Sequence, residues 1–481
     1  MQHPVLIAGA GPTGLTLAID LARRGIAVRL IDRAAEFFAG SRGDGIQPRT
    51  LEVFDDLGVF DAIDAAAASA PVMRAYLDGQ FAGEHRMSDP VEPTPAIPYP
   101  NLRMLGQSRT EAILRERLAE FGVRVELGTA LESFDQDADG VTAVIARDGA
   151  TETVRAAYLV GADGGASTVR KALAIAFEGT TDDSLRMLLG DVRADALDHD
   201  YGHWFAAAAN PMAGIALSPL PGGRHFQFAA PLDGDAEPTL ATLQEYLHRY
   251  SAREDLNLTE LAWVTVWRPN IRLAQRFRSG RVFLAGDAAH VHPPTGGQGM
   301  NTGIQDAYNL GWKLAAAIDG DPGPLQTYEP ERRAVAARVL GISTDLLDKL
   351  VEGAEDAMER GEQTRQLDLT YRNPADTGRV AVGDRAPDAP LKDAAGNAVR
   401  LFDLFRGPHA TLLRFGAAGE LPAEPGVRAY VVVRPGEPAG EGAVIDVEGH
   451  AYNAYDAVDG TQILVRPDGY IGTRQHMTPA R

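Results

Sequence analysis

The sequence predicts an α/β fold: a domain of βαβ type that is interrupted by an antiparallel sheet and followed by a small α/β domain. Three observations support this prediction. An apolar strand runs through a glycine-rich turn, Gly9 to Gly14, into an apolar helical stretch. From Leu185 to about Asn270, short segments alternate polar and apolar residues, which is typical of antiparallel strands. A further group of β-rich segments follows residue 410.

The first turn has the spacing of a dinucleotide-binding, Rossmann-like motif. The strand Val5 to Ala8 leads into glycines at positions 9, 11 and 14. Glycines at this spacing permit a tight turn, close approach of a pyrophosphate and close packing of helix on strand. The start of the helix offers free N–H groups to the phosphates. Asp32 ends the second strand, Val28 to Ile31, where a ribose-binding carboxylate is expected.

The middle of the chain interrupts this βαβ pattern and then resumes it. A proline-rich run between residues 90 and 100 excludes helix and central strand there. The other segments are predicted by apolar periodicity and β-rich composition. We expect helices over Pro48 to Leu57 and Thr110 to Phe121, and strands over Arg74 to Leu77, Val123 to Leu127, Gly140 to Ala146 and Thr153 to Val160.

The second half supplies the alternating strands and a second glycine-rich loop. We expect strands over Trp204 to Ala207, Phe226 to Ala230, Trp263 to Trp267 and Arg281 to Ala285. The last of these ends at Gly286-Asp287. Apolar residues at helical spacing then predict a helix over Asn301 to Ile318, directly after the loop Gly296 to Met300. A further helix is expected from about residue 330 to 353, and a linker over 373–388 precedes the small domain.

Composition excludes several classes of protein. A formal charge of −20 over 481 residues argues against binding to nucleic acid or to an anionic membrane. The absence of cysteine excludes disulfides, thiolate catalysis and cysteine-ligated metal centres. The histidine pairs 290/292 and 199/203 have no obvious third ligand, so no metal site is expected. No membrane segment is expected, and the first apolar stretch lacks the basic start of a signal peptide, so we expect a cytoplasmic protein.

Three motifs together carry a resemblance to a known family. They are the glycine set with Asp32-Arg33, the segment from Asp163-Gly164 to Arg170, and Gly286-Asp287. On these motifs the chain resembles the class A, single-component FAD-dependent aromatic hydroxylases that act on phenols and aromatic polyketides. The resemblance implies a PHBH-like fold, with residues 1–71, 101–180 and 271–372 binding FAD and residues 72–100 and 181–270 binding substrate. Residues 383–481 resemble the family's thioredoxin-like domain, without a Cys-x-x-Cys motif. We expect this domain to act as a scaffold or in dimer contact, which leaves a homodimer open.

The resemblance also implies roles for individual residues. The glycine turn would hold the FAD pyrophosphate, Asp32 the ribose and Asp287 a ribityl hydroxyl. The N–H groups at the start of the second helix would face the flavin edge, where their dipole favours a reduced, anionic flavin. The expected cofactor-binding residues are Gly9, Gly11, Pro12, Thr13, Gly14, Asp32, Arg33, Arg42, Gln107, Asp163, Gly286, Asp287, Pro294, Gly297, Gly299, Met300 and Asn301. The candidate substrate residues are Trp204, Phe226, Phe228, Trp267, Pro293 and Thr295.

The implied reaction uses NAD(P)H, with NADPH favoured, and O₂ to hydroxylate a small aromatic substrate through a flavin C4a-hydroperoxide. The chain has one Gly-x-Gly-x-x-Gly motif, so the nicotinamide donor is expected to dock transiently. No catalytic side chain can be assigned from the sequence. A Baeyer-Villiger or antibiotic-inactivating monooxygenase remains an alternative, as does a non-catalytic FAD- or pigment-binding protein. A flavin halogenase is disfavoured, because no lysine precedes Lys171 and no Trp-x-Trp-x-x-Ile motif occurs.

Overall fold

The structure, a computed structural model, describes residues 3–232, 234–293, 296–352, 361–416, 424–438, 440 and 442–476. The chain divides into two units. The first comprises Met1–Thr50, Asp61–Pro90 and Leu102–Thr364, and the second comprises Leu51–Phe60, Val91–Asn101 and Arg365–Arg481.

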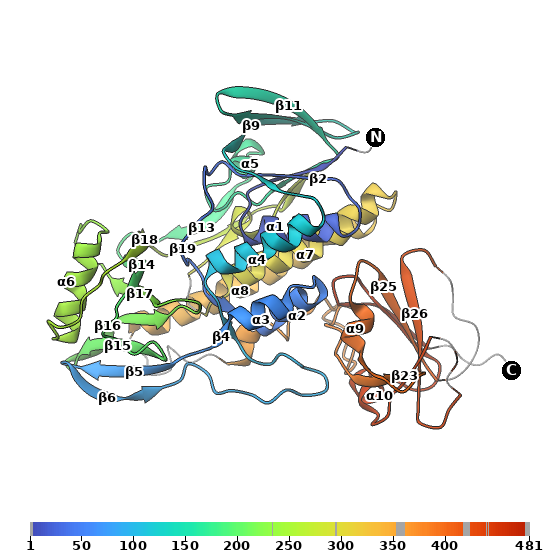
Figure 1. Ribbon diagram of the computed structural model, residues 1–481. Helices are drawn as coiled ribbons and strands as arrows, with labels where there is room; N and C mark the ends of the chain where they lie inside the picture. Colours follow the sequence, from blue (N-terminus) through green and yellow to red (C-terminus); the bar gives the residue numbers. More distant parts are fainter. Residues whose placement is uncertain are drawn as a thin grey trace. The chain divides into compact units, whose positions relative to one another are not determined.

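A six-stranded sheet organises the first unit (Figure 1). Its order is β20-β21-β12-β1-β2-β8, and all neighbours are parallel except β20 and β21. The strands are β1 (Val5–Ala8), β2 (Val28–Ile31), β8 (Val125–Glu126), β12 (Tyr158–Gly161), β20 (Arg278–Ser279) and β21 (Val282–Leu284). The helix α1 (Pro12–Ala22) follows β1 and packs against α4 (Gln107–Glu120) and α7 (Gly299–Ile318). This arrangement confirms the predicted Rossmann-like domain.

A seven-stranded sheet, inserted between segments of the first, is also present in this unit. Its order is β18-β14-β17-β16-β15-β5-β6, antiparallel except for the β15/β5 pair. The strands are β5 (Val72–Leu77), β6 (Gln80–His85), β14 (Met187–Arg193), β15 (Tyr201–Ala207), β16 (Asn210–Pro219), β17 (His225–Pro231) and β18 (Leu261–Trp267). The predicted antiparallel sheet is therefore confirmed.

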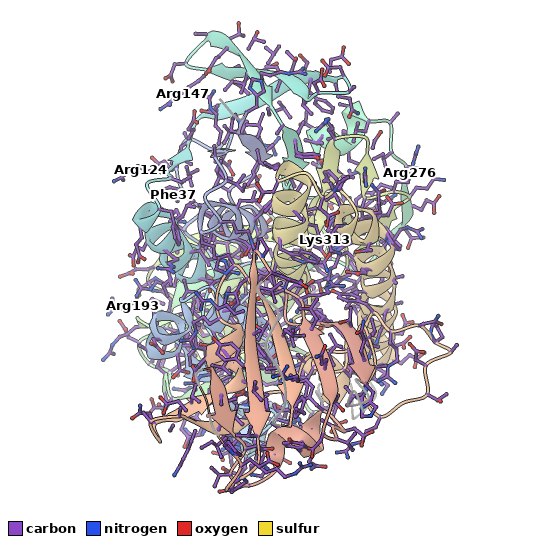
Figure 2. The ribbon with its side chains drawn as sticks, turned by 90° about the vertical axis from the view of Figure 1, so that its right-hand side faces the viewer. Phe37, Arg124, Arg147, Arg193, Arg276 and Lys313 are labelled. Atoms are coloured by element: carbon purple, nitrogen blue, oxygen red, sulfur yellow. The ribbon has the colours of Figure 1, made fainter. Side chains whose placement is uncertain are left out.

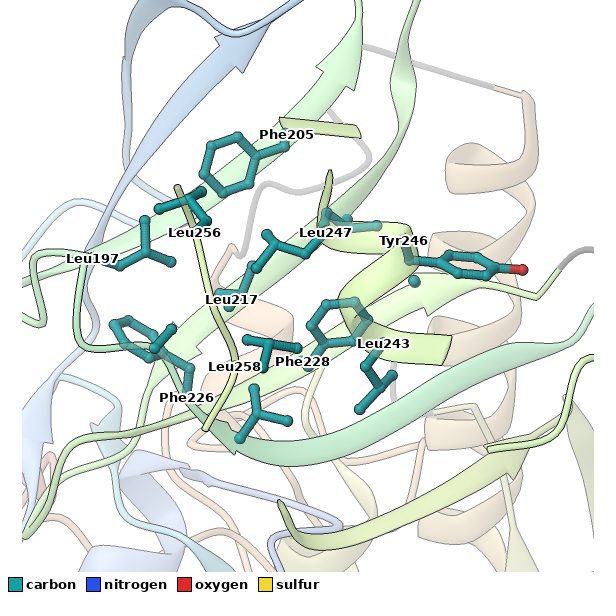
Figure 3. Close-up of a cluster of buried hydrophobic side chains, with 14 of the residues drawn as sticks. Leu197, Phe205, Leu217, Phe226, Phe228, Leu243, Tyr246, Leu247, Leu256 and Leu258 are labelled. Atoms are coloured by element: carbon teal, nitrogen blue, oxygen red, sulfur yellow. The ribbon is translucent and has the colours of Figure 1, made fainter. Parts of the chain in front are cut away.

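One face of this sheet is closed by α6 (Leu240–Ser251). Figure 3 shows the apolar side chains that meet there, among them Phe205, Phe226 and Phe228 from the sheet and Leu243 from the helix. All four are fully buried or nearly so. Burial of such side chains contributes about 1.5–3 kcal/mol each, so this core holds α6 on the sheet.

One predicted strand is wrong. The segment Thr153 to Val160 was expected to be continuous, but it belongs to two strands in different sheets. β11 (Ala150–Ala156) pairs in a three-stranded sheet with β9 (Thr129–Gln136) and β10 (Val141–Arg147), whereas β12 joins the parallel sheet. The break falls at Ala157, whose N–H donates to the Pro4 carbonyl. Uniformly β-forming residues on both sides concealed this change of sheet.

The remaining elements of the first unit are short, apart from one long helix. Two three-stranded sheets contain β13 (Phe177–Thr181), β19 (Asn270–Ala274) and β22 (His290–Val291), and β3 (Gly45–Ile46), β4 (Ala68–Ser69) and β7 (Arg103–Met104). The helices are α2 (Pro48–Asp56), α3 (Phe60–Ala66), α5 (Thr168–Ala172) and α8 (Tyr328–Glu352), with 3₁₀ turns η1 (Gly286–Ala288), η2 (Pro324–Thr327) and η3 (Glu362–Arg365). Residues 51–56 of α2, Phe60 of α3 and Arg365 of η3 belong to the second unit.

The second unit is built on a mixed seven-stranded sheet of order β24-β23-β27-β26-β25-β28-β29. Its elements are β23 (Pro390–Asp393), β24 (Ala398–Arg400), α9 (Leu401–Phe405), β25 (Ala410–Phe415), β26 (Val427–Val433), β27 (Ala443–Ile445), α10 (His450–Ala454), β28 (Thr461–Val465) and β29 (Ile471–His476). Its core includes Leu413, Phe415, Tyr455 and Ile463.

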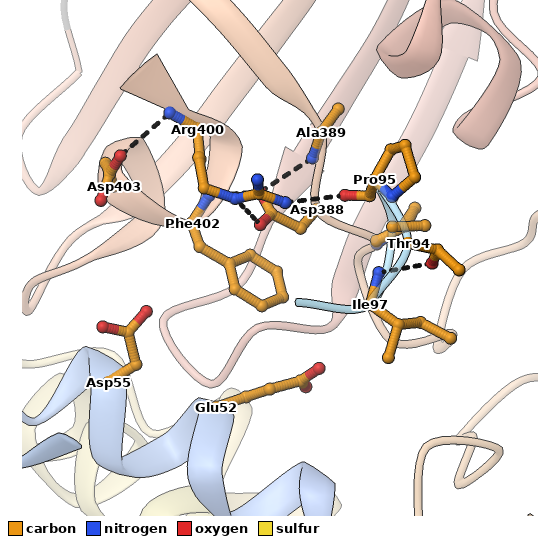
Figure 4. A network of polar contacts seen from close by, with 12 residues as sticks. Glu52, Asp55, Thr94, Pro95, Ile97, Asp388, Ala389, Arg400, Phe402 and Asp403 are labelled. Atoms are coloured by element: carbon orange, nitrogen blue, oxygen red, sulfur yellow. Dashed lines mark hydrogen bonds and ion pairs between the residues drawn. The ribbon is translucent and has the colours of Figure 1, made fainter. Parts of the chain in front are cut away.

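Residues 91–100, which the sequence placed with the substrate-binding domain, fall within this second unit. Figure 4 shows Arg400 between Asp388 and Pro95. Arg400 bonds the Asp388 carboxylate and also donates to the Pro95 carbonyl, and the Asp388 N–H donates to the Ala96 carbonyl. Prolines have no N–H group with which to pair in a strand. The carbonyls of Pro95 and Ala96 accept hydrogen bonds here from a side chain and from a loop N–H instead.

Positive charge is carried mainly by arginines at the surface. Figure 2 labels Arg124, Arg147 and Arg276, all of them exposed, and Lys313, which is buried. Lys313 is paired with Glu331 at 2.7 Å. Among the helices that the structure describes, none combines the length and the apolar character required to cross a bilayer.

Candidate active site

The glycine turn between β1 and α1 is shaped for close approach. Gly9 has a φ of +106°, and a Cβ there would lie 2.2 Å from the Ala162 carbonyl oxygen. A Cβ at Gly14 would lie 1.9 Å from the Gly9 oxygen, whereas one at Gly11 would meet nothing within 4 Å. Helix α1 starts beside this open space, and Gly11 provides no side-chain cap for it. The turn therefore fits a pyrophosphate, which the N–H groups and the helix dipole would bind.

Asp32 lies directly beside this turn. Its Oδ2 accepts the N–H of Ala10 at 2.8 Å, and its Oδ1 accepts the N–H of Ala34 at 2.8 Å. These bonds fix the carboxylate while each oxygen retains a lone pair for a ribose hydroxyl. Arg33 and Arg42 are exposed, and the Arg42 guanidinium lies 4.5 Å from the centre of the Phe38 ring.

The turn at Gly286-Asp287 contacts the first glycine turn. Gly286 has a φ of +61°, and a Cβ there would lie 2.6 Å from Thr13 Oγ1. A Cβ at Gly303, in the first turns of α7, would lie 2.4 Å from the same oxygen. Asp287 is exposed beside this junction, although desolvation by the surrounding protein raises the pKa of its carboxyl. The fold thus places the accessible Asp287 carboxylate next to the start of α1, where it can accept a hydroxyl hydrogen bond.

A buried ion cluster holds the turn at Gly286-Asp287 in place. Asp306 of α7 accepts hydrogen bonds from the Gly286 N–H at 3.0 Å, from His290 Nε2 at 2.6 Å and from Arg332 Nε at 2.6 Å. Burial opposes ionisation of Asp306, but Arg332 and His290 nevertheless hold its pKa below the usual value. Neither Asp306 nor Arg332 was among the residues predicted from the sequence. Asp306 lies off the apolar face that Ile304, Ala307 and Gly311 define, so the helical periodicity carried no signal for this cluster.

The loop before α7 is joined to the segment before α2 by one side chain. Asn301 is fully buried; its Oδ1 accepts the N–H of Gln47, and its Nδ2 donates to the carbonyls of Gly45 and Gly297, each at 2.8 Å. Gln47 Nε2 in turn donates to the Gly296 carbonyl at 3.1 Å. The start of α7 has no side-chain cap, so its N–H groups are available to an anionic flavin edge.

The other predicted residues around this loop differ in how exposed they are. Gly297 is exposed, Gly299 and Met300 are half-buried, and Pro293 is buried. Pro294 and Thr295 lie outside the described residues.

Gln107 and Asp163 lie at the starts of two helices. Gln107 Nε2 donates to Glu111 Oε1 at 2.7 Å, which leaves the amide oxygen of Gln107 for another donor. Asp163 Oδ2 accepts the N–H groups of Thr168 and Val169, so this carboxylate fixes the start of α5. Its Oδ1 is buried and has no hydrogen-bond partner among the described residues.

The candidate substrate residues divide between the two faces of the seven-stranded sheet. Phe226 and Phe228 lie in the core beneath α6, which corrects their assignment as substrate residues. Alternation along the strands places Trp204 and Trp267 on the opposite face, together with Asp191, Gln227 and Trp263. We call this opposite side the polar face. The sequence showed the alternation but not which side the helix would cover.

The segment Gly40 to Gln47, here the 40–47 loop, packs on the polar face. Gln227 Nε2 donates to the Ser41 carbonyl at 2.6 Å. A Cβ at Gly40 would lie 2.0 Å from Trp263, and the rings of Phe38 and Trp263 meet edge to face at 5.6 Å. Because Asn301 bonds the other end of this loop, the loop connects the polar face with the start of α7.

Metal coordination finds no support in the described part of the chain, where no three His, Cys, Asp or Glu side chains are grouped to hold an ion. The two adjacent loops, the ribose-type carboxylate Asp32 and the uncapped helix starts instead fit one long cofactor with a pyrophosphate and a flavin end, namely FAD.

Comparisons with known proteins agree with this geometry. A family model described as "FAD binding domain" matches residues 2–343. A flavin-dependent monooxygenase of Mycobacteroides abscessus is 44% identical over 482 residues, covering 97% of this chain and 96% of the relative. Pentachlorophenol 4-monooxygenase of Sphingobium chlorophenolicum is 33% identical over 516 residues, covering 98% of this chain and 93% of the relative.

A solved structure adds a ligand-bound example. The ternary complex of aklavinone-11 hydroxylase with FAD and aklavinone superposes with a TM-score of 0.80 at 30% identity, covering 98% of this chain and 95% of that one. The fold, the flavin-type loops and these similarities agree, and the chain therefore belongs to the FAD-binding-domain family and is an FAD-dependent monooxygenase.

Proposed function

We propose that this monooxygenase hydroxylates a phenolic or polycyclic aromatic substrate, with O₂ as the oxygen source and NAD(P)H, NADPH in preference to NADH, as the electron donor. The observation that carries this proposal is the 40–47 loop, which joins the flavin-edge end of α7 to a sheet face bearing tryptophans and a buried carboxylate. Relatives support the substrate class, since one acts on pentachlorophenol and another binds aklavinone.

In this proposal the chain's own residues bind and orient the cofactor. Gly9, Gly11 and Gly14 with the start of α1 hold the pyrophosphate, Asp32 holds the ribose and Asp287 holds a ribityl hydroxyl. Bound FAD supplies hydride acceptance and the activation of O₂. The protein contributes by excluding water and by holding the substrate ring against the flavin. Trp204, Trp263 and Trp267 are the aromatic side chains that the polar face offers for this purpose.

The decisive experiment measures oxygen transfer. Purified holoenzyme is given NADPH or NADH under ¹⁸O₂ with a panel that includes pentachlorophenol and aklavinone, and products are analysed by mass spectrometry and NMR. We expect one ¹⁸O atom on a ring carbon and faster consumption of NADPH than of NADH. Insertion of oxygen into a carbon–carbon bond would identify a Baeyer-Villiger enzyme instead. Bound flavin without any labelled product would support a non-catalytic binding protein.

The cofactor assignment has a separate test. Asp287→Ala is expected to lower the flavin-to-protein ratio after purification, because a hydroxyl acceptor is lost. Asp200→Ala, which changes another exposed aspartate, serves as the matched control and should leave the ratio unchanged. Equal flavin content in both variants would contradict the role given to Asp287.

A further inference from the structure

Asp191 is a buried carboxylate that the flavin-binding residues do not use. It lies in the middle of β14, and its side chain is 3% exposed. Its cross-strand neighbours are Gln227 on β17 and Trp263 on β18. Asp191 Oδ1 is buried without a hydrogen-bond partner among the described residues, and so is Trp263 Nε1. A buried, unpaired carboxylate oxygen is costly unless a bound group completes it.

Within the described part of the chain, two other buried aspartates of this unit are paired with cations, whereas Asp191 is not. Asp20 is bonded by Arg23 and Arg24, and Asp306 by Arg332 and His290. Asp191 forms no ion pair with any residue that the structure describes. A purely structural carboxylate at this depth would be expected to have such a cation. Asp191 therefore has only the neutral donors of Trp263 and Ser41 beside it and no cation among the described residues, and a ligand hydroxyl would complete its surroundings.

The surroundings of Asp191 place the pKa of its carboxyl close to the physiological pH range. Desolvation raises the pKa of Asp191 to about 6. The hydrogen-bond donors of Trp263 and Ser41 beside the carboxylate oppose this rise, and the Asp44 carboxylate adds to it. Burial likewise raises the pKa of Asp44, on the 40–47 loop, to about 6. The adjoining strands present Gln227 and Trp263 toward Asp191, and neither side chain titrates near neutral pH.

The 40–47 loop connects Asp191 to the flavin end of the site. Ser41 lies against Asp191 and is bonded by Gln227, while Gly45 and Gln47 are bonded by Asn301 at the start of α7. A Cβ at Gly43 would lie 4.0 Å from the Met300 Cβ. Asp191 therefore lies on the sheet face that this loop links to the flavin edge.

We propose, on the basis of the function proposed above, that the Asp191 carboxylate is the base that accepts the proton of the substrate's phenolic hydroxyl. The O–H bond of the phenol breaks, the proton moves to a carboxylate oxygen of Asp191, and the electron pair stays on the substrate oxygen. This pair conjugates into the ring and makes the ortho and para carbons more nucleophilic. No electron is gained or lost in the step, and the proton returns to the product oxygen or to solvent.

A binding experiment tests the contact without turnover. The probes are 2-naphthol and its methyl ether, 2-methoxynaphthalene, in which a methyl group replaces the hydroxyl hydrogen. Holoenzyme is titrated with each at pH 7.5, followed by naphthalene fluorescence and by perturbation of the flavin spectrum. We expect wild type to prefer 2-naphthol by about tenfold or more, as for a hydrogen bond to a charged group. Asp191→Ala should lose this preference while keeping its flavin. Equal affinities in wild type, whether strong or weak, would overturn the proposal.

A kinetic experiment separates Asp191 from its neighbour Asp44. With a substrate from the oxygenation panel, kcat/KM of wild type should fall below about pH 6, where Asp191 becomes protonated. Asp191→Asn should abolish this acidic limb and lower kcat about 100-fold or more. Asp44→Asn should only move the limb to lower pH, because a repelling charge is removed. The reverse pattern would assign the base to Asp44 and refute the proposal.

The phenol's own acidity gives a further check on turnover. Pentachlorophenol ionises in neutral solution, so its oxygenation should suffer far less from Asp191→Asn than that of a weakly acidic phenol. An equal loss with both would indicate a structural role and would contradict base catalysis. If 2-naphthol binds through Asp191 but no phenol is oxygenated, the proposed function fails while the binding role of Asp191 stands.

Discussion

The two faces of the seven-stranded sheet share the same strands and differ in what they bury. The α6 face buries Phe226 and Phe228 in a continuous apolar core. The polar face, reached by the intervening residues, buries Asp191 and packs Gln227 against the 40–47 loop. Strict alternation allows one strand to stabilise the fold on one side and to carry chemistry on the other. Under the proposed function, stability and function are separable residue by residue.

The largest expected effect is on the α6 face. Phe228→Ala removes a fully buried ring and should lower the free energy of unfolding by about 3–5 kcal/mol. The measurement is urea unfolding monitored by far-ultraviolet circular dichroism. Flavin content per folded molecule should not change. A loss of flavin at unchanged stability would mean that Phe228 faces the site after all.

A change of opposite sign is expected on the polar face. The pKa of Asp191 lies about 2 units above the ordinary value of 3.8, so the folded state binds its proton more tightly than the unfolded state. The stability that the folded protein gains from holding this proton is fully present below about pH 4 and is lost as the pH rises through 6. Asp191→Asn should therefore stabilise the protein at pH 7.5, by about 3 kcal/mol at most, and should give no gain near pH 4. Destabilisation at pH 7.5 would show that the carboxylate is satisfied.

The contact between Gly40 and Trp263 tests how tightly the loop packs on the polar face. Gly40→Ala places a methyl group against the indole and should cost about 1–3 kcal/mol. The same substitution in a Trp263→Ala background should cost much less, and a double-mutant cycle measures the difference. Additive effects would show that the loop does not pack on the ring.

The smallest expected effect concerns one hydrogen bond. Gln227→Ala removes the donor to the Ser41 carbonyl and should cost about 1 kcal/mol. Gln227 neighbours Phe228 on the same strand, so the pair of variants compares the two faces directly. A cost for Gln227→Ala as large as that for Phe228→Ala would remove the distinction between them.

Much of the cofactor region was predictable because its constraints are local. The glycines at 9, 11 and 14 and the carboxylate at 32 follow from the geometry of one turn and one strand end, and the structure places them together. The helix at Asn301 to Ile318 followed from its periodicity and starts only two residues earlier, at Gly299. Such features require no knowledge of distant parts of the chain.

The missed features depend on contacts between distant segments. Asp306 and Arg332 become a pair only when α7 and α8 pack together. Asp191 gains its significance from a loop about 150 residues earlier in the sequence, near Ser41 and Asp44. The division of Phe226 and Trp204 between two faces depends on the position of α6. Periodicity shows that a strand has two sides but not which side a helix will cover.

The amide of Asn301 satisfies three backbone groups that come from two widely separated stretches of sequence. Anyone who transplants residues 40–47 from a relative to alter selectivity must bring a compatible beginning of α7 with them. An Asn301→Asp exchange would turn two donors into acceptors opposite two carbonyls. Loop grafting in this enzyme is thus a two-segment design problem, even when only one segment touches the intended ligand.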